Sequence, residues 1–315
     1  MTWMETRYLQ KTSGGSFLVS LPKEWVLRNR LEKGSTVGIV SPDMGILIVD
    51  PNPMGAREPR SIELELTQDI GRALTAGYLS GYERITIRGK KVITSSQKDE
   101  IESSAARLAG LEIINETSDT VLLANLSVPL DLSVVDVMRR MYQIGDSMLL
   151  DAVESLVRGN EGLAKNVIER DDALDRLYFL LIRLLKMAVR DQRSADKMGV
   201  LPTQCLDLRI AASMMEKIGD KSVEMCSLLL DTGGRIPRET ISLSLELSKI
   251  YGKATRALLE SDFGLSSKVI RNRRDITEVI SGLAAESRSQ GEDAMGILDE
   301  ITDHIFDIAD VVTEG

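Results

Sequence analysis

Two rows of acidic side chains in the second half of the chain have a spacing that suits cation binding. Glu216 and Asp220 are four residues apart, and Asp299 and Asp303 repeat the pair further along. Both rows fall in windows whose apolar residues recur three and four apart, which predicts helices. Residues four apart lie on one face of a helix, about 6 Å apart along its axis. Each like-charged pair costs roughly 0.2–0.5 kcal/mol, so protons or cations are expected to compensate.

A third acidic pair can complete a site with the first row. Asp171 and Asp175 are also four residues apart, in a separate predicted helix. If the two helices pack side by side, four carboxylates converge and repel strongly unless they are protonated or bind cations. Sites that offer only oxygen ligands select hard ions such as Mg²⁺, Ca²⁺, Mn²⁺ or iron. We therefore predict a metal site formed by Asp171, Asp175, Glu216 and Asp220, with solvated surface acids as the alternative.

The second row is a weaker candidate for metal binding. The helix expected to face Asp299 and Asp303 carries arginines where the first site has acids, namely Arg271, Arg273 and Arg274. Guanidinium groups form strong pairs with carboxylates and neutralise them without a metal ion. The arginines therefore favour a salt-bridged cluster over a second metal site.

The helices that must position these acids form an all-α half of the chain. Apolar stripes such as Met138, Met141 and Met148 are typical of buried helix faces. The helical pattern stops at residues 232–237 and then restarts. We therefore predict tandem three-helix bundles, one over residues 130–232 and the other over residues 238–315.

The segment before them, residues 60–127, alternates strand and helix patterns in the order β-α-β-α-β-β. This order predicts a small α/β module with helices on one face of a sheet. Gly89-Lys90-Lys91 could meet an anion, but the segment contains no GxxxxGK[ST] phosphate loop. A structural connector or a dimerisation module is the favoured interpretation.

Residues 1–52 form a third kind of segment, so the fold class is α+β multidomain. A strand is predicted at 17–21, a short helix that begins after Pro22 at 23–30, and two strands at 36–40 and 45–50. A chain this short buries little apolar surface, so we expect it to dimerise or to pack on its neighbours. Residues 1–60 include eight basic and six acidic residues, a net charge of +2, whereas the whole chain has a net charge of −9.

Composition limits the classes of function. The negative charge of the 315-residue chain argues against a protein that coats nucleic acid along its whole length, but it allows a small basic module. Cys205 and Cys226 lie about six turns apart on one predicted helix, which makes a disulfide between them improbable and suits a reducing compartment. No signal peptide or membrane span is recognisable, so we expect a cytoplasmic protein without membrane insertion.

The first segment resembles a known family. The resemblance rests on Arg7-Tyr8-Leu9-Gln10-Lys11, a Gly-Gly-Ser turn, Val19-Ser20-Leu21-Pro22-Lys23-Glu24-Trp25 and Leu31-Glu32-Lys33-Gly34. These motifs are similar to those of AbrB/SpoVT-type swapped-hairpin domains, although Ser35 stands where that family often has an acid. The resemblance implies a DNA-binding homodimer with interlaced strands. The residues that it implies for DNA contact are Arg7, Lys11, Lys23, Arg28 and Arg30.

The helical half resembles a second family, PhoU. The motifs Glu216-Lys217-Ile218-Gly219-Asp220 and Glu169-Arg170-Asp171-Asp172-Ala173-Leu174-Asp175, set in two three-helix units, carry this resemblance over roughly residues 130–315. With the first segment, the whole chain resembles an archaeal PhoU-related phosphate uptake regulator. The resemblance implies control of phosphate uptake and contact with phosphate-transport or signalling proteins. It also implies iron, zinc, manganese, magnesium or another metal ion on the acidic motifs.

These observations combine into one hypothesis with two alternatives. The hypothesis is a homodimeric, cytoplasmic transcriptional regulator of phosphate homeostasis with a metal-binding sensory half. The first alternative is an adaptor that contacts a phosphate transporter or a signalling protein and does not bind DNA. The second is a metal-dependent phosphohydrolase, which is disfavoured because the chain has a single histidine and no nucleophile motif. We therefore expect that the protein is not an enzyme.

Overall fold

The computed structural model describes residues 5–40, 46–53, 59–126, 132–286 and 289–313. The chain forms two compact units, Met1–Glu58 and Pro59–Gly315, which are considered separately. Within the described residues, none of the helices combines the length and the apolar character needed to cross a membrane.

Unit 1 consists of short strands around one short helix. Strands β1 (Gln10–Lys11) and β2 (Phe17–Leu18) pair antiparallel, helix α1 spans Lys23–Arg28, and β3 (Gly38–Val40) pairs antiparallel with β4 (Ile48–Asp50). The predicted strands and helix are present but shorter, and Gly45 of the predicted strand at 45–50 lies outside the described residues. Strand β1, which the apolar pattern did not predict, pairs across the turn at residues 12–16.

The apolar side chains of unit 1 are open to solvent in the single chain. Tyr8 is 93% exposed, Ile39 66% and Phe17 64%. None of the residues of this unit that the structure describes is buried. Since apolar burial is the main favourable term in folding, the unit lacks a core of its own.

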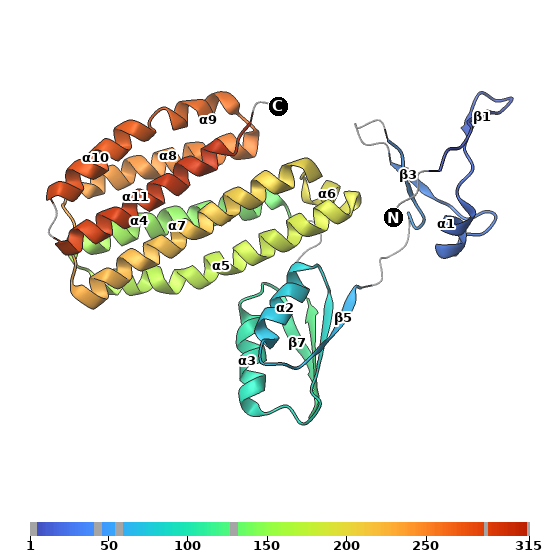
Figure 1. Ribbon diagram of the computed structural model, residues 1–315, viewed down its shortest axis with the longest axis horizontal. Helices are drawn as coiled ribbons and strands as arrows, with labels where there is room; N and C mark the ends of the chain where they lie inside the picture. Colours follow the sequence, from blue (N-terminus) through green and yellow to red (C-terminus); the bar gives the residue numbers. More distant parts are fainter. Residues whose placement is uncertain (1–4, 41–45, 54–58, 127–131, 287–288, 314–315) are drawn as a thin grey trace. The chain divides into compact units, whose positions relative to one another are not determined.

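Unit 2 begins with the α/β module, whose elements follow the predicted order (Figure 1). The sheet has the strand order β5-β6-β8-β7, in which only β5 and β6 are parallel. Helices α2 and α3 cover one face of the sheet (Figure 1). The bounds are β5 Ser61–Glu65, α2 Ile70–Leu79, β6 Arg84–Arg88, α3 Ser95–Ala106, β7 Leu111–Glu116 and β8 Thr120–Asn125.

A small apolar core explains why these residues adopt these elements. Ile85 and Ile87, two residues apart on β6, point to the helix-covered face and are fully buried. Ile70, Leu74 and Tyr78, four residues apart on α2, belong to the same buried cluster. Helix α3 begins with a capping box in which Thr94 and Gln97 satisfy each other's backbone amides.

The rest of unit 2 is helical. The bounds are α4 Val134–Arg158, α5 Glu161–Arg190, α6 Gln192–Met198, α7 Cys205–Thr232, α8 Thr240–Glu260, α9 Phe263–Ile270, α10 Arg273–Glu286 and α11 Ser289–Asp310. The described part of the second predicted three-helix unit contains four helices, because its middle part is divided into α9 and α10. The backbone carbonyl of Asn272 accepts a hydrogen bond from the Ile276 amide at the beginning of α10.

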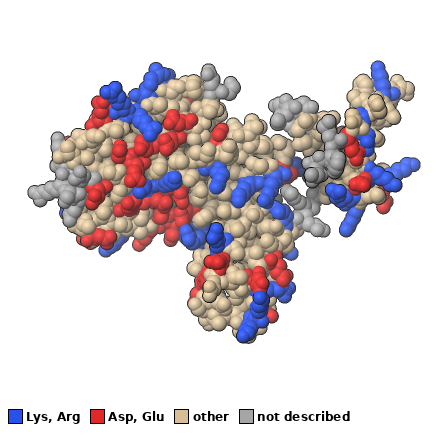
Figure 2. Space-filling view, in the orientation of Figure 1, with Lys and Arg blue, Asp and Glu red and all other residues tan. Residues whose placement is uncertain are grey.

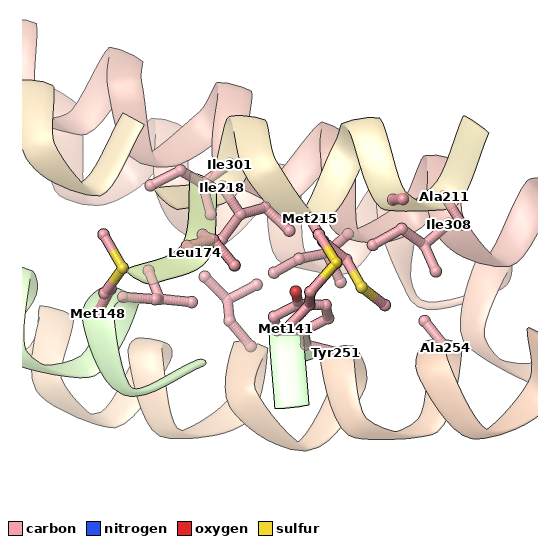
Figure 3. Close-up of a cluster of buried hydrophobic side chains, with 14 of the residues drawn as sticks. Met141, Met148, Leu174, Ala211, Met215, Ile218, Tyr251, Ala254, Ile301 and Ile308 are labelled. Carbon is pink, nitrogen blue, oxygen red and sulfur yellow. The ribbon is translucent and has the colours of Figure 1, made fainter. Parts of the chain in front are cut away.

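The two predicted three-helix units share one core. Helix α7 packs against α4, α5 and α11, and α8 packs against α4 and α11. Figure 3 shows methionine and isoleucine side chains from α4, α7 and α11 meeting Tyr251 of α8 in this core. The free cysteines Cys205 and Cys226 are buried in α7. The acidic rows on α7 and α11 therefore belong to a single packed body.

A buried arginine holds the α/β module on the helical body. Arg183 of α5 is 3% exposed and donates hydrogen bonds to the carbonyl oxygens of Tyr78 and Tyr82, the latter at 2.9 Å. Its guanidinium lies 4.7 Å from the centre of the Tyr78 ring. Arg190 of α5 also donates to the Ser80 carbonyl. These cations meet the C-terminal end of α2, where unpaired carbonyls and the helix dipole favour positive charge.

Candidate metal centre on the acidic helix faces

Three aspartates from two helices meet at one place. Carboxylate oxygens of Asp171 and Asp175 on α5 and of Asp220 on α7 all lie within 4.8 Å of one another. Figure 2 shows acidic side chains gathered over this part of the helical body. The structure thus brings together three of the four residues predicted for the first metal site.

Gly219 allows the two helices to approach at this point. A Cβ atom at Gly219 would lie 2.4 Å from Leu174 Cδ2 and 3.5 Å from Asp171 Oδ1. Leu174 itself is fully buried between the two aspartates of α5. A side chain at position 219 would therefore push α5 away and separate the carboxylates.

The electrostatics of the cluster favour uptake of a positive charge. Burial, reinforced by the charges of Asp175 and Asp220, raises the pKa of Asp171 from 3.8 to about 6. Burial and then Asp220 raise the pKa of Glu216 from 4.5 to about 7. The pKa of Asp220 is raised by burial and by Asp175. Carboxylates whose ionised form is disfavoured in this way are stabilised by a proton or by a bound cation.

One oxygen in the cluster lacks a partner. Asp171 Oδ1 is buried and makes no hydrogen bond with any residue that the structure describes. Buried polar atoms are nearly always paired, so an atom of this kind indicates a missing ligand, ion or water. An all-carboxylate donor set with an unpaired oxygen fits a hard divalent cation. The residues present are thus suited to a metal ion.

Glu216 lies beside the three aspartates and is not part of the group that meets within 4.8 Å. It is half-buried, one helical turn before Asp220 on α7. Its raised pKa, to about 7, shows that it lies within the field of the cluster.

The second acidic row is paired with an arginine from α10. Arg273 lies 2.7 Å from Asp303, 3.7 Å from Asp307 and 3.6 Å from Asp310. Burial, followed by the charge of Asp303, raises the pKa of Asp299. Asp299 and Asp303 do not join a group of three acidic ligands within the described part of the chain. The geometry is that of a salt-bridged cluster around Asp303.

The α/β module supplies a cation to the first cluster that the sequence did not reveal. Arg107, which follows α3, donates a hydrogen bond to Asp175 Oδ2 at 3.0 Å. The two residues are 68 positions apart. Neither helical periodicity nor any motif predicts a pair at that separation, because it depends on how the module docks on α5.

The residues predicted for DNA contact lie in unit 1 and are all exposed. Arg7 forms an ion pair with Glu5. The others are placed on β1, on α1 and just after α1; they are Lys11, Lys23, Arg28 and Arg30. Arg30 has a positive φ of 54°, which marks the turn that leaves α1.

Comparison with known families explains the acidic helices. Residues 138–229 match the family described as PhoU domain. This part of the chain has the sequence features of a PhoU domain. It spans α4 to α7 and contains Asp171, Asp175, Glu216 and Asp220. Residues 10–56 match the family described as Antidote-toxin recognition MazE, bacterial antitoxin, which agrees with the AbrB-like resemblance of unit 1.

Among solved structures, the chain is similar to the crystal structure of PhoU from Pseudomonas aeruginosa. The identity is 20%, the TM-score is 0.43, and the match covers 57% of this chain and 93% of that chain. No curated protein sequence matches the chain.

Proposed function

We propose that the protein is a homodimeric transcriptional regulator of phosphate uptake, with a DNA-binding unit 1 and a PhoU-type half that binds a metal ion. The observation that carries the proposal is the presence of a MazE/AbrB-like domain and a PhoU domain in one chain. The first suggests contact with DNA and the second suggests a link to phosphate transport.

Unit 1 supports the proposal through its charge and its lack of a core. Its basic residues are exposed to solvent and can contact phosphate oxygens of DNA. Its exposed Tyr8, Phe17 and Ile39 require a covering surface, which a second copy provides in a dimer with interlaced strands. Two-fold symmetry of the dimer predicts a two-fold related DNA site.

The PhoU domain supports the metal-binding part of the proposal. Asp171, Asp175 and Asp220 would hold the ion, with Glu216 as the adjacent carboxylate. A divalent cation supplies positive charge that offsets the mutual repulsion of these groups. The oxygen-only donor set favours magnesium, manganese or iron, and zinc is the other ion implied by the family resemblance.

Binding to the promoter of a phosphate-transport operon tests the DNA-binding part. Gel shifts at several salt concentrations should show that Lys11→Ala plus Arg28→Ala weakens binding by at least tenfold. The slope of log affinity against log salt should also fall by about two, since each phosphate contact contributes about 0.9. Lys253→Ala, an exposed substitution on α8, is the matched control. Equal binding by the double variant and the control would contradict the DNA-facing role.

Metal content tests the second part. Elemental analysis of the purified chain should show less bound metal after Asp171→Asn plus Asp220→Asn than after Glu161→Gln, an exposed substitution on the α5 helix outside the acidic motif. Equal metal content in the two proteins would refute the ligand assignment.

The adaptor alternative predicts a different pattern. A chain that regulates a transporter by direct contact would co-purify with membrane transport components and would protect no promoter DNA. Promoter protection by the intact chain, lost in the Lys11 and Arg28 double variant, excludes this alternative.

A further inference from the structure

The α/β module carries a pocket that the proposed function does not use. Its volume is about 380 Å³, and residues of α2, of the end of α3 and of α5 line it. Cavities of about 300–1,000 Å³ accept small molecules. The polar part of the wall is formed by Arg72, Thr75, Ser103, Ser104 and Arg107, and Phe179 contributes an aromatic face.

The charge of the wall is positive. Two lining residues are arginines and none is a carboxylate. Arg72 is exposed and makes no ion pair with any residue that the structure describes. The guanidinium of Arg107 lies 6.0 Å from the centre of the Phe179 ring and is shared with Asp175 at 3.0 Å. Guanidinium groups present forked donors that match the oxygens of phosphate.

The partial charges of the helix ends at the pocket do not change the positive charge of its wall. Gly71 and Arg72 belong to the first turn of α2, and the Asp69 side chain does not cap its amides. That end of a helix carries about +0.5 of an elementary charge, and the opposite end of α3 carries about −0.5. These partial charges cancel, so the sign of the field is set by Arg72 and by Arg107, whose charge is shared with Asp175.

Two of the hydroxyl groups donate hydrogen bonds to helix carbonyls, Thr75 to Gly71 O at 2.9 Å and Ser103 to Glu100 O at 3.0 Å, so their oxygens are held in place. A Cβ atom at Gly71 would lie 2.6 Å from Ser104 Oγ, so the Ser104 hydroxyl packs directly against the glycine of α2. The clamp of Arg183 on the carbonyls of Tyr78 and Tyr82 fixes α2 against α5. The wall contributed by α2 and the wall contributed by Phe179 are therefore held at a constant separation.

We propose that this pocket binds a small phosphate-bearing anion. Arg72 and Arg107 contact the phosphoryl oxygens, and the hydroxyls of Thr75, Ser103 and Ser104 line the remainder of the site. The ligand is either inorganic phosphate or a phosphate monoester whose organic part lies against Phe179. The proposal does not depend on DNA binding, and the pocket shares Arg107 with the acidic cluster through Asp175.

Isothermal titration calorimetry of the full, metal-free chain at constant ionic strength tests the proposal. The probes are inorganic phosphate and AMP, with chloride as the anion control. The intact chain should show saturable binding of at least one probe, and Arg72→Ala and Arg107→Ala should each weaken it by at least tenfold. Arg72→Lys should retain part of the affinity, because lysine keeps the positive charge but lacks the forked pair of guanidinium donors. Tighter binding of AMP than of phosphate identifies a monoester site.

Arg84→Ala is the matched control, since Arg84 is an exposed arginine of the same module outside the pocket wall. Unchanged thermal melting of each variant shows that the module is folded. A second measurement is amide exchange, in which phosphate should protect the start of α2. The proposal is overturned if the intact chain binds neither probe at millimolar concentration. It is equally overturned if Arg72→Ala binds as tightly as the intact chain, or if Arg84→Ala weakens binding as much as Arg72→Ala does.

Discussion

Replacing Asp171 and Glu216 with residues that do not titrate should reduce the pH dependence of the folding stability of the metal-free protein. In the folded chain the pKa of Asp171 is about 6 against 3.8 ordinarily, and the pKa of Glu216 is about 7 against 4.5. The folded state therefore binds more protons than the unfolded state between these values. The stability from this source is complete below pH 3.8 and is lost as the pH rises through 7.

The magnitude follows from the two shifts. Each exceeds about two pH units, and one unit corresponds to about 1.4 kcal/mol, so full burial would give about 3 kcal/mol per group. Both side chains are only half-buried, and solvent screening reduces such contributions, so we take about half of each value. The expected loss between pH 4 and pH 8 is thus about 3 kcal/mol in total.

The assay is chemical denaturation of chelator-treated protein across this pH range. The double variant Asp171→Asn plus Glu216→Gln keeps the shape of both side chains and cannot titrate. The difference between the two pH profiles isolates the cluster, because all other titrating groups are common to both proteins. Asn166→Gln, an exposed substitution of a non-titrating residue on the same helix, should leave the profile of the intact chain unchanged. Parallel profiles for the intact chain and the double variant would refute the reasoning.

Three further predictions concern packing and ion pairs. Gly219→Ala should destabilise the chain by about 1–3 kcal/mol in a denaturation experiment, because the new methyl group overlaps Leu174. Arg183→Met should cost about 2–4 kcal/mol by leaving two carbonyls of α2 without donors, and amide exchange at residues 78–82 should accelerate. Arg273→Ala should cost about 1 kcal/mol or less, because the side chains of Arg273 and Asp303 are 39% and 50% exposed, and added salt should reduce the effect.

The sequence predicted the acidic cluster because local patterns carried most of the information. Four-residue spacing placed Asp171 with Asp175 on one helix face, whereas the close approach of α5 and α7 at Gly219 depends on how the two helices pack. The order of the α/β module was equally readable, because alternation and helical spacing are local properties. Strand β1 was missed since a two-residue strand has no period to detect.

What the sequence did not predict depends on contacts between distant segments. The α/β module, for which the sequence favoured a connector or dimerisation role, contacts α5 through Arg183. Its Arg107 pairs with Asp175, 68 positions away. The three-helix pattern predicted over 238–315 also did not include the break between α9 and α10. Pairing of Arg273 with Asp303 was among the expected outcomes, but its additional contacts with Asp307 and Asp310 required the fold.

The position of Arg107 has a thermodynamic consequence. One guanidinium faces both Asp175 and the arginine-lined pocket, so it cannot serve both at full strength. An anion that draws Arg107 into the pocket leaves Asp175 with more negative charge to offer a cation, and a cation on Asp175 leaves Arg107 freer for an anion. Linkage requires that each ligand then raise the affinity for the other by the same factor. A chain with this arrangement would bind the two ions cooperatively, so it would respond most strongly when phosphate and metal are both present.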